Sequence, residues 1–332
     1  MSRKKLVTLL AAAALVTGCK SRLTGNEGNL EFSYVADDAL TDFNKPIAVG
    51  AKLDVEVAEV GTRRAVTLQK ATSDDAAVLA IAGFSGNKLT LEGKSSGSAL
   101  IEVEAKRSDD AVVTDSVNML ARVPEVLKLR HTCASGAEAA YLVDHEFLVP
   151  FDMEMKNGQP VIGYGYHPVE LLPQGALTLD ATTKDQSSLH LKSGKERMEA
   201  TVKSTLDATS LKLFLVQPGD VDAAVLEGPT QAGTEIGKSN LFLVRPKVGE
   251  RMLCQPTLAL TAASTTPEIC EVKAANTGGD VNENPENKHG WVQVTGKKLG
   301  KCEFTVTYAA AKGGAGLTSP FTADIIEVKR PQ

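Results

Sequence analysis

The sequence lacks several patterns that identify common classes of protein. After Val16 there is no apolar run long enough for a membrane-spanning helix, which needs about 20 such residues. Helical periodicity is hard to find, which argues against an α-helical fold. The five histidines show no spacing typical of zinc ligands, so we expect no zinc site and no other cofactor.

The chain also has no excess of positive charge. Its 332 residues have a net charge of −5, and residues 1–18 contribute three positive charges and no acid, so their removal gives −8. An acidic chain has no electrostatic attraction to nucleic acid or to anionic lipid. We therefore expect no nucleic-acid partner.

The N-terminus contains the parts of a secretion signal. A positive region at residues 3–5 precedes the apolar run Leu6–Val16, which is too short to cross a bilayer as a helix. The small residues Thr17 and Gly18 and then Cys19 follow, as expected at a cleavage site. Residues 1–18 are therefore predicted to be a signal peptide.

The segment Val16-Thr17-Gly18-Cys19 resembles the lipobox of bacterial lipoproteins. The resemblance implies cleavage before Cys19 and attachment of several acyl chains to this cysteine, which together anchor a protein firmly. Lys20 follows, and in proteobacterial lipoproteins such a residue favours the outer membrane. The alternative is an ordinary signal peptide with a chance cysteine, which the position directly after Gly18 disfavours.

Alternation of polar and apolar residues dominates the rest of the chain. It is clear in Lys52–Val57, Lys88–Glu92 and Lys301–Tyr308, and clusters of Gly, Asn, Asp, Ser and Pro separate such segments. This period of two is typical of strands with one buried face. Many short strands with such turns predict an all-β chain of β-sandwiches.

An internal repeat supports this interpretation. Residues 89–103 (LTLEGKSSGSALIEV) match residues 292–306 (VQVTGKKLGKCEFTV), and residues 73–81 match residues 264–272. Both copies contain two glycines four positions apart, which suits a tight turn with positive φ. These glycines are Gly93 and Gly97 in the first copy and Gly296 and Gly300 in the second.

The repeat resembles the bacterial immunoglobulin-like domains of group 2. The resemblance covers about residues 50–122 and 240–328, and it implies tandem immunoglobulin-like β-sandwiches. In between, residues 183–191 match the first motif segment and Thr201–Ser204 could form its last strand, but the glycine pair is missing. We predict a stalk at residues 19–29, domains at 30–123 and 229–332, and a divergent middle domain at 124–228.

Four cysteines remain after Cys19, and in an oxidising compartment they suggest disulfides. The repeat aligns Cys270 with Leu79 and Cys302 with Ala99. Some members of the resembled family have cysteines at both places, which implies a Cys270–Cys302 bond. Cys133 and Cys254 could form a second bond that fixes the angle between two domains.

Other side chains are weaker candidates for a binding site. Tyr164 and Tyr166 would share one face of a strand, where they form either part of the core or an exposed platform for protein or glycan. Asp280, Asn282 and Asn284 offer oxygen ligands for calcium, although a solvated loop is the more ordinary interpretation.

No catalytic constellation is evident. Gly93-Lys94-Ser95-Ser96-Gly97 has the spacing of a nucleophile elbow, but a strand rather than a helix should follow it. The leading hypothesis is a non-enzymatic lipoprotein of the outer membrane, facing the periplasm or the cell surface, that serves as a structural, adhesion or interaction module. Its partner would be an unknown protein or polysaccharide of the cell envelope. The alternatives are a carbohydrate-binding or enzyme-accessory module, and a hydrolase in the middle domain with a polar cleft near His145 or His167.

Overall fold

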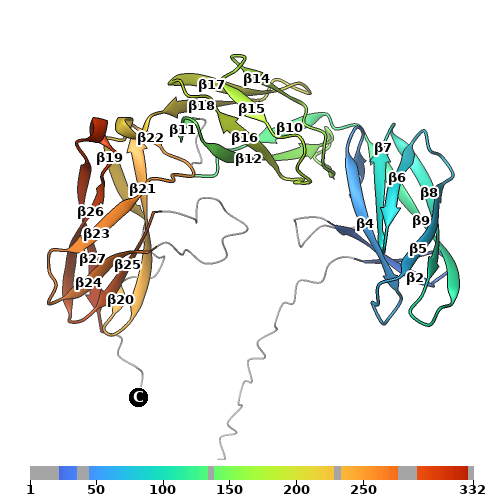
Figure 1. Ribbon diagram of the computed structural model, residues 1–332, viewed down its shortest axis with the longest axis horizontal. Coiled ribbons are helices and arrows are strands. Elements are labelled where there is room, and N and C mark those ends of the chain that lie inside the picture. The colour runs from blue at the N-terminus through green and yellow to red at the C-terminus, as the bar shows by residue number, and fades with distance from the viewer. Residues whose placement is uncertain (1–21, 36–44, 134–137, 228–232, 276–289, 328–332) are drawn as a thin grey trace, which may run out of the picture. The chain divides into compact units, whose positions relative to one another are not determined.

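A computed structural model describes residues 22–35, 45–133, 138–227, 233–275 and 290–327. These residues form β-strands with only short single-turn helices between them, so the all-β class is confirmed. The chain divides into two compact units, Met1–Val123 and Pro124–Gln332 (Figure 1). Within the described ranges, no helix is long and apolar enough to span a membrane.

The first unit holds one immunoglobulin-like sandwich. One sheet has the strand order β1-β2-β4-β7-β6 and the other the order β3-β9-β8-β5. The strands are β1 (Leu23–Thr24), β2 (Leu30–Val35), β3 (Ile47–Ala48), β4 (Lys52–Glu59), β5 (Thr67–Ser73), β6 (Leu79–Ser85), β7 (Lys88–Gly93), β8 (Gly97–Lys106) and β9 (Val112–Arg122).

The second sandwich opens the second unit. Its sheets have the orders β10-β12-β16-β15, with β13 beside β12, and β11-β18-β17-β14. The strands are β10 (Val126–Leu129), β11 (Glu138–Leu142), β12 (Glu146–Glu154), β13 (Pro160–Val161), β14 (Val169–Leu172), β15 (Leu177–Leu179), β16 (Ser188–Ser193), β17 (Met198–Ser204) and β18 (Ser210–Val216).

The third sandwich completes the second unit. Its sheets have the orders β19-β21-β25-β24, with β22 beside β21, and β20-β27-β26-β23. The elements are η1 (Pro218–Asp220), β19 (Ala223–Glu227), β20 (Thr234–Glu235), β21 (Ser239–Val248), β22 (Arg251–Met252), β23 (Leu260–Ser264), β24 (Cys270–Ala275), β25 (Trp291–Gly296), β26 (Gly300–Tyr308), η3 (Lys312–Gly314) and β27 (Leu317–Ile326).

All three sandwiches begin in the same way. The first strand pairs antiparallel in one sheet, and the chain then adds a short parallel strand to the other sheet. The parallel pairs are β3 with β9, β11 with β18, and β20 with β27. The predicted repeat therefore corresponds to a shared topology, and the divergent middle segment has it too.

The strand registers show how closely the sandwiches correspond. Leu79 lies opposite Gly93 in the first sandwich, and Cys270 lies opposite Gly296 in the third. On the other sheet, Ala99 and Cys302 occupy matching places on β8 and β26. The corresponding core pairs are Leu79 and Ala99 in the first sandwich, Leu177 and Ala200 in the second, and Cys270 and Cys302 in the third.

The prediction that the repeated glycines have positive φ is confirmed for only one of the four. Gly300 has a φ of 143°, whereas the others need glycine for lack of space. A Cβ on Gly93 would lie 2.6 Å from the Ala48 carbonyl oxygen, and one on Gly97 would lie 2.6 Å from Val78. Gly93 is therefore required by the close approach of the parallel strand β3, and Gly97 by the close approach of the Val78 side chain.

In the middle sandwich a serine occupies the place of the first glycine of the pair. Ser193 lies opposite Leu177, as Gly93 lies opposite Leu79. Its buried hydroxyl donates to the Leu142 carbonyl oxygen (2.7 Å) and accepts the His145 N–H (3.0 Å). The predicted match of residues 183–191 is also off by one strand, since β16 occupies the place of β7 and β15 that of β6.

Two predicted boundaries need correction. Residues 22–29 are not a free stalk, because Leu23 and Thr24 pair with β2 and the following turn binds to β9. The third sandwich begins before residue 229, because β19 pairs with β21 over Ala223–Glu227. β19 and β20 belong to different sheets of this one sandwich, so no boundary between domains separates them.

Candidate functional site at the joint of the second and third sandwiches

Two disulfides lie within the described residues, and they have different locations. Cys270 and Cys302 lie in the core of the third sandwich, with a Cα–Cα distance of 5.6 Å, and join its two sheets. Cys133 and Cys254 are 5.1 Å apart by the same measure, and they connect the second sandwich to the third across 121 positions of sequence. The second bond lies at the joint between these two domains.

Main-chain pairing continues across this joint. Leu253 pairs in parallel with Ala140, at the edge of the second sandwich, and the Cys254 N–H donates to the Ala140 carbonyl oxygen (2.9 Å). Close by, the Arg251 guanidinium stacks 3.5 Å from the centre of the Phe214 ring and forms an ion pair with Glu138 (3.1 Å). Backbone pairing, the contacts of Arg251 with Phe214 and Glu138, and a disulfide therefore all connect the two sandwiches at this joint.

The apolar core is also continuous at the joint. Leu142, Val216 and Val221 belong to the same buried cluster as Leu253 and Leu258. Buried apolar contact resists bending, because separation would expose this surface to water. The second and third sandwiches thus share one packed interface.

Gln255 completes the joint with three side-chain hydrogen bonds. Its amide accepts the Leu148 N–H (2.8 Å) and donates to the Leu148 carbonyl oxygen (2.7 Å) and to the Thr132 hydroxyl (3.1 Å). Gln255 is buried and has a φ of 48°, which is unusual for a residue other than glycine. This amide fixes the third sandwich to an edge of β12.

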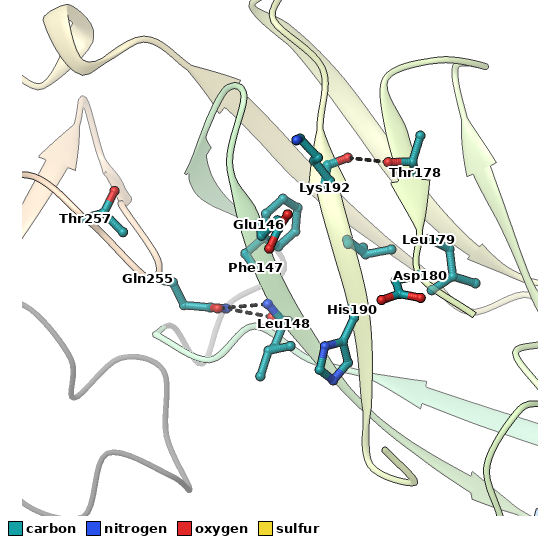
Figure 2. A pocket seen from close by; sticks show the side chains of 11 residues that line it. Glu146, Phe147, Leu148, Thr178, Leu179, Asp180, His190, Lys192, Gln255 and Thr257 are labelled. Carbon is teal, nitrogen blue, oxygen red and sulfur yellow. Dashed lines mark hydrogen bonds between the residues drawn. The ribbon is translucent and has the colours of Figure 1, made fainter. Parts of the chain in front are cut away.

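A pocket of about 560 Å³ lies beside Gln255 (Figure 2). Its floor is the outward face of β12, β16 and β15, and Gln255 and Thr257 form the wall on the side of the third sandwich. Side chains alternate along a strand, so the residues that face outward between the core positions form one surface. The outward-facing floor residues are Glu146, Leu148, Thr178, Asp180, His190 and Lys192.

Hydrogen bonds hold several of these side chains in place. The Thr182 hydroxyl (2.6 Å) and the Thr182 N–H (2.9 Å) both donate to Asp180, and they lower the pKa of this carboxyl. The His190 ring bonds to Asp185 (2.8 Å), and the Thr178 hydroxyl donates to the Lys192 carbonyl oxygen (3.4 Å). Because its pKa is lowered by the two bonds from Thr182, Asp180 is ionised at neutral pH.

The pocket lies near one histidine that the hydrolase hypothesis singled out. His145 bonds through Nε2 to the Thr257 hydroxyl, which is the pairing of a nucleophile with a base. An activated nucleophile also needs a third group to orient the base. Within the described ranges, no side chain bonds to the other ring nitrogen of His145. His167 lies against the Phe151 ring instead, and burial lowers its pKa.

The tyrosine pair does not form a platform. Tyr164 is only 8% exposed and lies under the Lys184 ammonium, 5.1 Å from the ring centre, while Tyr166 is half-buried. The two residues lie in an irregular segment after β13 and not on one strand face. Of the two interpretations offered by the sequence, the structure favours the core for Tyr164.

Other predicted residues fall outside the described ranges. These are the lipid-attachment residue Cys19 and the weak calcium candidates Asp280, Asn282 and Asn284. Among the residues with described positions, no group of three His, Cys, Asp or Glu side chains could hold a metal ion.

The sequence did not reveal the pocket. Alternation places Glu146 and Leu148 on one face of a strand, and likewise His190 and Lys192. The sequence gives no sign that Gln255, more than 100 positions away, closes this face. A cysteine directly before Gln255 was the one available signal that this segment meets the second sandwich.

Comparison with known proteins adds little about function. No protein-family model and no curated protein sequence matches the chain. Among solved structures, domains 4–9 of the surface layer protein SbsC are 13% identical with a TM-score of 0.28, covering 90% of this chain and 48% of that one. This chain thus spans about half the length of that fragment.

Two further structures have similar scores. The Escherichia coli adhesin FdeC is 12% identical with a TM-score of 0.25, covering 85% of this chain and 94% of that one. The Bacteroides ovatus protein SGBP-B, in complex with a mixed-linkage heptasaccharide, is 9% identical with a TM-score of 0.26, covering 89% and 70%. Such low values carry no inference about what this chain binds.

Proposed function

We propose that the protein is a non-enzymatic lipoprotein of the bacterial outer membrane, anchored through Cys19, that presents an interaction surface on a rigid pair of sandwiches. The observation that carries the proposal is the joint between the second and third sandwiches. A module that only needs to connect two points can have flexible linkers, because relative motion is the default between domains. Here a disulfide, the Gln255 amide and a shared core hold two domains together.

Fixed geometry benefits binding because a preorganised surface loses less entropy when its partner arrives. Side chains from both sandwiches contribute to the pocket at this joint, so its shape depends on the angle between them. An adhesion or interaction module has a use for such a surface, whereas a simple spacer does not.

The anchor can be tested by labelling cells with an alkyne-tagged fatty acid. We expect label on the wild-type protein and none on the Cys19→Ser variant, which should also leave the membrane fraction. The Cys254→Ser variant is a matched control and should retain its label. Equal labelling of wild type and Cys19→Ser would contradict the lipid anchor.

The rigid joint can be tested by electron-electron resonance between nitroxides on Lys212 and Lys273, in the second and third sandwiches. We expect one narrow distance distribution, and a broader one in a Cys133→Ser/Cys254→Ser variant. A broad distribution in the wild type would contradict the rigid pair.

The interaction role can be tested with the full chain immobilised in detergent and exposed to outer-membrane proteins and envelope polysaccharides. A component retained at micromolar concentration, and lost when the joint disulfide is removed, supports the proposal. Failure to retain any component would contradict it.

A further inference from the structure

We propose that the pocket at the joint binds a neutral mono- or disaccharide. This inference does not depend on the membrane anchor or on a macromolecular partner. It rests on the side chains that face the pocket, on their unused hydrogen-bonding capacity and on the rigidity of the wall.

The floor of the pocket combines apolar and charged groups. Leu148 is half-buried and offers an apolar surface on the outward face of the sheet. Leu179 also lines the pocket, but it lies opposite the core residue Leu191 and faces the interior. Glu146 and Lys192 are exposed and lie directly opposite each other on β12 and β16. A sugar ring has the same combination, with C–H groups on its faces and hydroxyl groups around its edge.

Glu146 and Lys192 have hydrogen-bonding capacity to spare. Within the described part of the chain, neither side chain forms an ion pair or a hydrogen bond, although their backbones are paired. A carboxylate only accepts hydrogen bonds and an ammonium only donates them. Hydroxyl groups do both, so neighbouring hydroxyls of one ring can donate to Glu146 and accept from Lys192.

The charges of the pocket favour a neutral ligand over a strongly charged one. Glu146 and Asp180 are balanced in part by Lys192, and His190 already bonds to Asp185. An anionic ligand would meet two carboxylates, and a cationic one would meet the ammonium of Lys192. Hydroxyl groups avoid both penalties and gain hydrogen bonds to charged groups, which are stronger than neutral ones.

The wall gives the pocket its shape before any ligand arrives. Gln255 is fixed by three hydrogen bonds, as Figure 2 shows for the two to Leu148, and the adjacent Cys254 is held by its disulfide. The volume of about 560 Å³ lies in the range of roughly 300–1,000 Å³ that is typical of small-ligand pockets. The floor offers one outward leucine, and Phe147, which also lines the pocket, is only 4% exposed and cannot stack on a sugar ring. We therefore expect a dissociation constant on the order of 1 mM.

Saturation-transfer NMR on the full chain in deuterated detergent tests this proposal. The probes are maltose, cellobiose and N,N′-diacetylchitobiose, with glucuronic acid and glucosamine as charged comparisons. We expect saturation transfer to at least one of the neutral disaccharides, and less to both charged sugars. The Glu146→Gln/Lys192→Ala variant should bind about tenfold more weakly, because it loses hydrogen bonds to charged groups.

The second sandwich offers a matched control on its opposite sheet. Glu199 and Lys212 form an exposed ion pair there (3.0 Å), so Glu199→Gln/Lys212→Ala removes the same charges away from the pocket. This control should bind like the wild type. The proposal is overturned if no neutral disaccharide receives saturation at 10-fold excess over the expected dissociation constant. It is equally overturned if the pocket variant and the control bind alike, or if a charged sugar binds best.

Discussion

The first and third sandwiches share a strand order and a register but are fastened in different ways. In the third, a disulfide between Cys270 and Cys302 joins the two sheets through the core. In the first, Leu79 and Ala99 occupy these places and only pack together. The first sandwich has a different fastening at its edge, where polar groups bind the N-terminal segment.

That fastening centres on Asp115, a fully buried residue of β9. Its carboxylate accepts four backbone N–H groups, from Glu27, Asn29, Leu30 and Ser116, at 2.7–2.9 Å. The Glu27 carboxylate in turn accepts the Ser116 N–H (2.7 Å). We call these hydrogen bonds of Asp115 and Glu27 the carboxylate clasp. In the register of the third sandwich, Ser319 occupies the place of Asp115, so the clasp has no counterpart there.

The comparison shows that the same backbone arrangement can be stabilised by a disulfide, by apolar packing or by hydrogen bonds to a buried carboxylate. The disulfide acts largely on the unfolded chain, whose freedom it limits, and this effect does not depend on pH. The clasp acts in the folded state through a charge, and it must weaken when that charge is neutralised. Differences in stability between the two sandwiches should therefore follow these two mechanisms.

The largest effect is expected from removal of the Cys270–Cys302 bond. The Cys270→Ser/Cys302→Ser variant should destabilise the third sandwich by about 4 kcal/mol, because the bond closes a loop of 32 positions. Two buried hydroxyls add to the loss. Trp291 is the only tryptophan and lies in β25, so its fluorescence during urea unfolding reports this sandwich.

The first sandwich supplies the matched control for this experiment. Cys270→Leu/Cys302→Ala converts the pair into the one found at Leu79 and Ala99, and it should recover about 1–2 kcal/mol relative to the serine variant. Equal stability of the two variants would show that the apolar pair of the first sandwich does not substitute for a disulfide here.

Asp115→Asn should give the next largest effect and confine it to the first sandwich. The variant keeps the shape of the side chain but replaces one oxygen, which accepts two of the four N–H groups, by an NH2 group that cannot accept. The other two hydrogen bonds lose their charge, and we expect a cost of roughly 2–3 kcal/mol. Hydrogen exchange of the Glu27, Asn29 and Leu30 amides measures this cost. Asp109→Asn, an exposed carboxylate nearby, is the control, and an equal change there would argue against a special role for the clasp.

The clasp also shows where prediction from the sequence fails. The alternation in Lys88–Glu92 predicted strand β7 correctly, with Leu89 and Leu91 buried, because burial on one face leaves a periodic pattern. The polar run Gly25–Asn29 was interpreted as a stalk, because its partners lie almost 90 positions away. Polar contacts of this kind leave no local pattern. The pocket escaped prediction for the same reason, since Gln255 meets Leu148 across 107 positions.

Acid should weaken the first sandwich through a second buried carboxylate, Glu59. The Ser108 N–H donates to it (2.7 Å), as does the Thr62 hydroxyl (2.8 Å), and these bonds lower its pKa from 4.5 to about 2. The folded state thus holds this proton less tightly than the unfolded chain. The stabilisation is complete above pH 4.5 and is lost as the pH falls toward 2.

Urea unfolding at pH 5 and at pH 2.5, followed by hydrogen exchange of the first sandwich, measures this effect. Glu59→Gln should be less stable than the wild type at pH 5, and its stability should change less between the two pH values. Glu102→Gln, on the exposed face of β8, should retain the pH dependence of the wild type. A Glu59→Gln variant with unchanged pH dependence would contradict the assignment.

The smallest effect concerns a turn that all three sandwiches share. Gly50 and Gly237 have φ values of 92° and 75°, and each donates its N–H to the glycine at the end of the neighbouring strand, at 2.8 Å. Asp144 takes this place in the second sandwich, with a φ of 51°, and donates to the Gly194 carbonyl oxygen at 2.8 Å. A left-handed conformation costs about 1–2 kcal/mol for a residue with a Cβ, and somewhat less for Asp.

Asp144→Gly should therefore leave the second sandwich unchanged or stabilise it by less than about 1 kcal/mol, because relief of this cost is offset by the greater freedom of glycine in the unfolded chain. The reverse change, Gly50→Asp, should destabilise the first sandwich by about 1 kcal/mol. Hydrogen exchange of the strands on either side of each turn compares the two variants. A loss above about 3 kcal/mol in Gly50→Asp would mean that the turns differ in their surroundings as well as in their residue. The shared register would then not extend to this corner, even though the backbone hydrogen bond is common to all three sandwiches.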